Sequence, residues 1–161
     1  MARDAPPEPQ RRPDGVGFLL AQVGGHAARR FAARVSTLDL TPPQAGLLRA
    51  IARQPGQTQQ SYAAHLGVPP SRFVTLVDSL EGRGSIERRR RPDDRRAYGL
   101  HLTADGEALM RDIGRVSRAH EDDLCQGLTD SERNTLRELL ARIADAQGLT
   151  PGVHPGYRDL Q

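Results

Sequence analysis

The sequence predicts a mainly α-helical protein that carries one small β-hairpin, and three observations lead to this fold class. Apolar residues recur every three or four positions along most of the chain, which is typical of amphipathic helices. Residues 83–103 instead form two short runs around a Pro-Asp-Asp turn, the second alternating apolar and polar positions as a strand does. With no Trp, three Phe and three Tyr, the hydrophobic core must also be mostly aliphatic, which suits packed helices.

The chain begins with a polar segment and a long helix. Residues 1–15 are rich in Pro, Arg and acidic side chains and are too polar to pack, so a flexible N-terminal arm is expected there. Residues 16–38 have apolar positions close to a four-residue spacing, which marks one face of an amphipathic helix. This helix is assigned to dimerisation. Its apolar residues are Leu19, Val23, Ala27, Phe31, Val35 and Leu38.

Three shorter helices follow. Thr41 and Gln44 have the spacing of a capping box and open the first of them, LTPPQAGLLRAIAR. Thr58 caps the second, QQSYAAHL, which ends at a glycine. The third comes after a Pro-Pro pair and reads SRFVTLVDSLEGRG. Its apolar face consists of Phe73, Leu76, Val77 and Leu80.

The hairpin concentrates positive charge. Residues 83–96 hold seven Arg against three acidic residues, a local formal charge of +4, whereas the whole chain carries +3. A basic patch on a body that is otherwise about neutral is typical of a surface that binds a polyanion. After the turn, apolar residues alternate with Gly99 and His101, which predicts a strand with one buried face and arginines on display. These apolar residues are Tyr98, Leu100 and Leu102.

Two short helices joined by a tight Gly-containing turn and followed by a basic hairpin predict a winged helix-turn-helix DNA-binding domain over residues 39–102. A helix about 10–12 Å across fits the major groove, and a hairpin arm can lay Arg in the minor groove beside it. A membrane surface is the other polyanion, but no basic amphipathic helix or lipidation signal is visible. Double-stranded DNA is therefore the predicted partner, and no membrane contact is expected.

Residues 103–147 predict two more helices, also assigned to dimerisation. Thr103 caps the first, and Thr129 with Glu132 forms a capping box for the second. The apolar faces of these helices point away from the winged-helix unit, so a second copy of the chain is expected to cover them. Twofold symmetry then sets two recognition helices about 34 Å apart and predicts a pseudo-palindromic operator. The predicted interface residues are Leu19, Val23, Val116, His120, Leu124, Leu136, Leu140 and Ile143.

Four stretches within residues 40–110 form a specific combination: LTPPQ, LVDSLEGRG, the hairpin tip DDRRA, and LTADGEAL after it. In this combination the chain resembles the MarR family of bacterial transcriptional regulators. The resemblance implies a homodimeric winged-helix repressor, in many members tuned by small aromatic or phenolic ligands and in some branches by oxidation. The peroxide-sensing branch has its reactive Cys in the first helix, where this chain has none, so that chemistry is not expected.

The fourth helix departs from a common family pattern, PSTVSRLVDRLE. A Ser-Arg pair is replaced by Val74-Thr75 and a further Arg by Ser79, while Arg72 restores one charge nearer the helix N-terminus. The base specificity is therefore expected to differ from that usual in the family. The basic hairpin, which forms the wing, should supply more of the affinity for DNA. In the family pattern the wing Asp helps to place the Arg. The predicted DNA-binding residues are Ser71, Arg72, Val74, Thr75, Arg88, Arg90, Asp94, Arg95 and Arg96, with Arg95 or Arg96 in the minor groove.

The resemblance also implies a ligand crevice near the first helix, for which His26 and Arg30 are the candidate residues. A lone helical His is more often a core or surface residue. His120 is expected to make a buried interface hydrogen bond rather than to act as a sensor. The single cysteine, Cys125, excludes an internal disulfide and a cysteine-based zinc finger, while an intersubunit disulfide stays open.

No Gly-rich phosphate loop, HExxH motif or nucleophile elbow is present, so no enzyme, cofactor or metal site is expected. No secretory signal and no apolar run near roughly 18 residues is visible, which predicts a cytoplasmic protein.

The predicted function is a homodimeric, sequence-specific transcriptional regulator, a repressor released by a small ligand. The alternative is a winged-helix module that binds another protein and has weak or no DNA binding. For the C-terminal tail, residues 148–161, packing on the partner and mobility both stay open.

Overall fold

The computed structural model describes residues 15–92, 94, 96–154 and 157. Residues 1–14 of the predicted arm and Arg95 lie outside the described residues. The described chain is mainly α-helical with one two-stranded antiparallel hairpin, as predicted. Its elements in chain order are α1 (Val16–Ser36), α2 (Pro42–Arg53), α3 (Gln59–Leu66), α4 (Pro70–Gly82), β1 (Ile86–Arg90), β2 (Tyr98–Leu102), α5 (Ala104–Leu124) and α6 (Asp130–Ala146).

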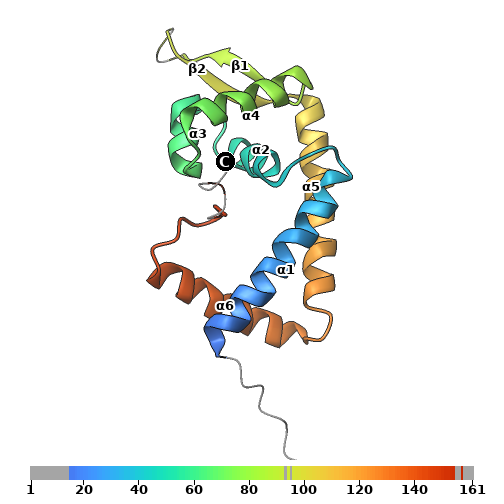
Figure 1. Ribbon diagram of the computed structural model, residues 1–161. Helices are drawn as coiled ribbons and strands as arrows, with labels where there is room; N and C mark the ends of the chain where they lie inside the picture. The colour runs from blue at the N-terminus through green and yellow to red at the C-terminus, as the bar shows by residue number, and fades with distance from the viewer. Residues whose placement is uncertain (1–14, 93, 95, 155–156, 158–161) are drawn as a thin grey trace, which may run out of the picture.

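Figure 1 shows two regions with different characters. The helices α2, α3 and α4 pack together beneath the β1–β2 hairpin and form a small unit at one end of the molecule. From this unit α1 and α5 run side by side toward the other end, where the chain turns from α5 into α6. The chain after α6 then returns toward α2 and α3.

The hydrophobic core lies within the small unit. Phe73 and Leu80 of α4 are completely buried against three aliphatic residues of α2, each of which is also buried. Each such side chain contributes about 1.5–3 kcal/mol relative to an exposed position. Val35 near the end of α1 and Ile113 in the middle of α5 join the same core, so the start of α1 and the last turns of α5 lie outside it. The three residues of α2 are Leu47, Leu48 and Ile51.

The predicted helix starts are confirmed by their hydrogen bonds. The Thr41 and Thr129 hydroxyls accept from the backbone N–H groups of Gln44 and Glu132, and each partner's side chain accepts from the threonine's backbone N–H, which completes two capping boxes. The Thr58 hydroxyl caps α3 in the simpler manner, as Thr103 caps α5. The hydrogen bonds at Thr129 also lower the pKa of Glu132.

The hairpin differs from the predicted alternation in β2. Leu100 is buried as expected, but Tyr98 is 47% exposed, so its assignment to the buried face is wrong. The neighbouring Gly99 is buried instead, because residues 56–58 pair with β2 on the side away from β1. The Gly56 N–H donates to the Leu100 oxygen at 2.9 Å, and a Cβ on Gly99 would lie 2.4 Å from the Gly56 oxygen. Sequence analysis missed this third pairing segment.

Two described residues of the C-terminal tail pack on their own chain, an arrangement that was not among the predicted alternatives. Val153 and Tyr157 lie against the core from the α2 side. The Tyr157 hydroxyl donates to the Pro42 oxygen at 3.1 Å, and its ring occupies the space above Gly46. A Cβ on Gly46 would lie 2.6 Å from the Tyr157 oxygen, so the tail depends on a residue without a side chain at this position of α2.

The contact between α5 and the start of β1 provides a stability test. An added Cβ at Gly106 would lie 1.9 Å from the Ser85 backbone oxygen, which cannot move without disturbing the hairpin. Gly106→Ala should therefore lower the free energy of unfolding by about 1–3 kcal/mol or more. Gly114→Ala in the same helix is the matched control, because its nearest neighbour is the flexible Arg118 side chain at 3.5 Å.

The control substitution should raise the free energy of unfolding by up to about 1 kcal/mol, since Ala favours helix over Gly. Urea unfolding followed by circular dichroism would measure both variants. Equal effects of the two substitutions would show that α5 does not approach Ser85 as closely as described.

Candidate nucleic-acid interface

One side of α4 is exposed beside the hairpin. Phe73, Val77 and Leu80 point into the core, which turns the opposite side of the helix toward solvent. There Val74 is 41% exposed, and Ser71 and Thr75 lie on the same exposed surface. Arg72 is half-buried, so its aliphatic stem packs while the helix start stays open. The structure thus brings together the four predicted contact residues of α4.

The N-terminal end of α4 is available to an anion. Its N-cap residue is Pro69, which makes no side-chain cap hydrogen bond, and Pro70 occupies the first helical turn. Helix N-termini carry a partial positive charge and unsatisfied N–H groups, which favour phosphate. The exposed Ser71 hydroxyl lies in the same turn. Pro69 and Pro70 have no N–H, and the Arg72 N–H donates to the Pro69 oxygen at 3.0 Å, so this end of α4 offers the Ser71 N–H and hydroxyl as donors.

Arg88 joins the hairpin to α4. Its guanidinium forms ion pairs with Glu81 and with Asp78, the latter at 2.7 Å, and its side chain is only 29% exposed. The single positive charge of Arg88 offsets part of the negative charge of these two acidic residues, which would otherwise repel a polyanion. Arg88 is therefore a residue that fixes the hairpin on α4, and its predicted contact with DNA stays a prediction.

The other strand arginines are more open. Arg90 lies opposite Tyr98 in the hairpin register, and its guanidinium carbon lies 6.0 Å from the Tyr98 ring centroid, at the outer limit of a cation–π contact. Arg89 points to the other face, where its Nε donates to Glu87 at 2.9 Å. The β1 arginines thus have three different environments, which a count of local charge does not distinguish.

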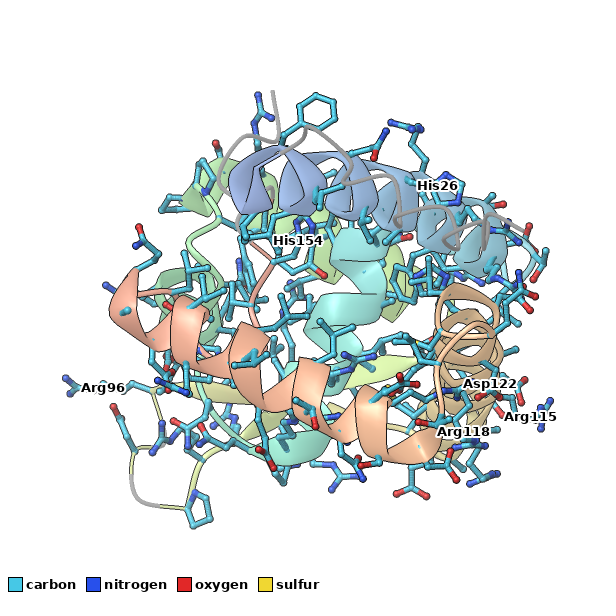
Figure 2. The ribbon with its side chains drawn as sticks, turned by 90° about the horizontal axis from the view of Figure 1, so that it is seen from below. His26, Arg96, Arg115, Arg118, Asp122 and His154 are labelled. Atoms are coloured by element: carbon cyan, nitrogen blue, oxygen red, sulfur yellow. The ribbon has the colours of Figure 1, made fainter. Side chains whose placement is uncertain are left out.

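The hairpin tip is closed by the predicted aspartate. The Asp94 carboxylate accepts from the Arg96 backbone N–H at 2.9 Å, and its backbone oxygen accepts from Ala97 at 3.0 Å. These bonds fix the backbone at Arg96 while the side chain stays exposed, at the margin of the molecule in Figure 2. Arg96 therefore combines a fixed backbone with an exposed side chain, as a contact in a DNA groove requires. Arg95 lies outside the described residues.

Two further side chains hold α4 in place and were not found by sequence analysis. The Gln44 side chain donates to the Ser79 hydroxyl at 3.0 Å, which ties α2 to α4. Arg83, just after α4, donates to the backbone oxygens of Leu38 and Asp39 in the turn between α1 and α2. Ser79 therefore has a positioning role, at the place where the family pattern has an arginine.

The two candidate ligand residues lie near each other on α1. His26 and Arg30 line an open groove of about 590 Å³ between α1 and the end of α5. Arg30 forms an ion pair with Asp123 at 3.2 Å, and Arg34 pairs with the same carboxylate. The groove therefore contains an acidic residue that already pairs with one of its cations, Arg30.

The predicted dimerisation residues share an exposed or half-covered apolar surface. Leu19 and Val116 are half-buried in the single chain, whereas the members on α6 and at the end of α5 are about 36–40% exposed. Val23 is more exposed still. The α6 helix has no buried residue. The exposed members at the end of α5 and on α6 are Leu124, Leu136, Leu140 and Ile143.

His120 contacts α1 rather than lying free on the interface. Its ring lies 5.5 Å from the Phe31 ring, and its Nδ1 is buried without a hydrogen-bond partner among the described residues. Burial lowers the pKa of His120, and the nearby charges of Arg34 and Arg30 lower it further. The predicted interface hydrogen bond therefore lacks a partner within the single chain.

The described residues contain no group of three or more His, Cys, Asp or Glu that could hold a metal ion. Among the same residues no helix is long and apolar enough to cross a membrane.

The helices α2–α4 and the adjoining hairpin define a winged helix-turn-helix protein, extended by three long helices. A model of the MarR family matches residues 38–97. A protein of Thauera aromatica named for transcriptional regulation of the hcr operon is 36% identical over 137 residues, which cover 84% of this chain and 82% of that relative. The chain belongs to the MarR family.

Solved structures of relatives agree with this assignment. The repressor CouR bound to a 23-mer DNA duplex is 34% identical, with a TM-score of 0.71 over 81% of this chain and 92% of that one. Rv2887 of Mycobacterium tuberculosis in complex with salicylic acid is 28% identical, with a TM-score of 0.66 over 81% of this chain and 96% of that one.

The lowered pKa of His120 predicts a pH-dependent stability. Because the folded chain disfavours the imidazolium, the unfolded chain binds more protons just below the ordinary pKa of about 6.5. The stability present above that pH should therefore fall as the pH drops through this window. His120→Gln should lose less stability than the wild type between about pH 7.5 and about pH 5.5. Urea midpoints at one protein concentration would show this, and equal losses would contradict it.

Proposed function

We propose that this protein is a homodimeric, sequence-specific DNA-binding transcriptional regulator, a repressor that a small phenolic ligand releases from its operator. The observation that carries the proposal is the basic hairpin that Arg88 fixes beside the exposed side of α4. Relatives support it, since CouR has been solved with a DNA duplex and Rv2887 with DNA and with salicylic acid.

In the proposed complex α4 enters the major groove. Val74 is placed to touch a thymine methyl group, and the Thr75 hydroxyl to bond a base edge or a phosphate. That hydroxyl lies 3.5 Å from the Ser71 oxygen, a long hydrogen bond that a base can replace. The Ser71 N–H and hydroxyl at the start of α4 bind a backbone phosphate, and Arg72 adds positive charge beside it.

The hairpin reaches the neighbouring minor groove. Asp94 holds the backbone of Arg96, and the exposed guanidinium enters the narrow groove, where the negative potential is highest. Arg95 is assigned to the same minor-groove contact from the sequence alone. Arg90 is assigned to phosphate contact, and Arg88 to positioning the hairpin.

The dimer proposal follows from the uncovered apolar surface. Residues 16–38 and 103–147 form the dimerisation region around residues 39–102, the DNA-binding domain. A twofold axis through these helices would present two α4 helices to successive major grooves, about 34 Å apart. A ligand releases the operator if it binds better to a dimer with another spacing, because equal affinity for both states shifts nothing.

A cytoplasmic location and the absence of catalysis belong to the same proposal, since the family's members are transcription regulators. A protein-binding winged helix without DNA affinity remains the competing function. Its test is the response to salt, because DNA affinity falls steeply with salt concentration as condensed counterions are released.

Arg96→Ala should weaken binding to specific and non-specific duplexes alike and reduce the slope of log affinity against log salt by about 1. The matched control is Arg115→Ala, which removes the same charge from an exposed position of α5, on the opposite side of the molecule in Figure 2. Fluorescence anisotropy with labelled DNA would measure both slopes. A wild-type affinity that does not depend on salt would favour the protein-binding alternative.

Thr75→Val should change base preference, because it removes a hydroxyl at constant shape. Discrimination at one base pair should fall by about 1–3 kcal/mol while non-specific affinity is retained. Thr135→Val is the control, since its hydroxyl likewise bonds the backbone oxygen four residues earlier, but on α6. Competition with single-base operator variants would measure the preference. An unchanged preference would place Thr75 outside the base contacts.

A further inference from the structure

A second cavity, of about 330 Å³, lies between α2, α3 and the C-terminal tail. It is separate from the α1–α5 groove that holds His26 and Arg30. Its volume lies at the lower end of the range of about 300–1,000 Å³ for small-molecule sites, which suits a ligand of about one ring. Residues that matter for its chemistry are Arg49, Arg53, Tyr62, Leu66, Pro151 and Gly152.

Two arginines for which no ion pair is found among the described residues line this cavity. Arg49 and Arg53 lie four residues apart on α2, so their side chains project from the same face and repel each other. Arg49 donates to the Ser117 hydroxyl at 3.3 Å, and no ion pair involves Arg53 in the part of the chain that the structure describes. Among the described residues no Asp or Glu lines the cavity. An anion would therefore relieve a repulsion that no acidic side chain among the described residues offsets.

The tail forms one wall of the cavity and is fixed from outside it. Gly152 has a φ of 74° and approaches Arg53 so closely that a Cβ there would lie 2.6 Å from the guanidinium. Beyond this wall, Tyr157 is anchored over Gly46 and on the Pro42 oxygen. The positive charge of Arg49 also acts on Tyr157, whose pKa is raised by burial and lowered in part by this charge.

We propose that this cavity is the effector site and that it binds a small carboxylate with a flat apolar ring. The carboxylate would be held by Arg49 and Arg53, whose planar guanidinium groups match its geometry. The ring would lie against Tyr62 and Leu66 of α3. The inference rests on the proposed function, and it places the effector away from the α1–α5 groove, where Asp123 already pairs with Arg30.

The position of the site gives a route to regulation. A ligand there touches α2 and α3 of the winged-helix unit and also the tail that continues from α6. Ligand binding and tail docking must therefore strengthen each other by the same factor. The ligand thus fixes the winged-helix unit relative to α6, which lies in the dimerisation region.

Titration calorimetry of the full chain with salicylate tests the site. The wild type should bind salicylate saturably, and salicylamide, its uncharged analogue, at least about tenfold more weakly. Arg53→Gln should weaken salicylate binding about tenfold or more, whereas Arg115→Gln, the charge-matched control on α5, should not change it. Arg30→Gln decides between the two sites. Loss of binding in Arg30→Gln with retention in Arg53→Gln would overturn the proposal, as would a wild type that does not bind salicylate.

The role of the tail has its own variants. Tyr157→Ala should weaken salicylate binding several-fold although this residue does not line the cavity, whereas Tyr157→Phe should keep most of the affinity because it retains the ring over Gly46. Equal affinity of Tyr157→Ala and the wild type would overturn the coupling between ligand and tail.

The same variants separate this inference from the proposed function. DNA affinity without salicylate should be retained in Arg53→Gln, because the cavity lies away from the α4 surface. A wild type that binds salicylate but no DNA would refute the regulator, whereas one that binds DNA but not salicylate would refute only the effector site.

Discussion

The structure depends on how the apolar faces of its long helices are covered. The core of the winged-helix unit is closed by α2, α3, α4 and the hairpin, and the start of α1 and the last turns of α5 lie outside it. The remaining apolar residues, above all those of α6, have no cover within the described chain. A second copy with the same faces would bury them, and its symmetry would also fix the distance between two α4 helices. The same dimer contact would thus bury these apolar faces and set the spacing of the two α4 helices.

Ion pairs determine what the basic hairpin presents. Arg88 forms ion pairs with Asp78 and Glu81, so it joins the hairpin to α4 and offsets part of the negative charge on that helix. Arg96 is fixed through its backbone and keeps its guanidinium exposed. The hairpin therefore has fewer arginines available for an external contact than it contains, but their positions are more rigidly held. A rigid display reduces the conformational entropy lost on binding.

Local features of the fold could be predicted from the sequence, because caps and amphipathic periods act within a few residues. Thr41, Thr58, Thr103 and Thr129 begin helices as expected. The errors and omissions all involve contacts between distant segments. The pairing of residues 56–58 with β2 buries Gly99, and the docking of Tyr157 over Gly46 needs a position without a side chain. For the candidate site, composition and spacing located the basic hairpin and α4, but could not show that Arg88 is paired.

The most direct test of the central claim is to let the purified protein select fragments of its own genomic DNA and to sequence them. A dimer that presents two α4 helices should enrich inverted repeats whose half-site centres lie about 10 base pairs apart, one helical turn. Enrichment of unrepeated sites, or no enrichment above bulk DNA, would contradict the account of a symmetric dimer that reads an operator.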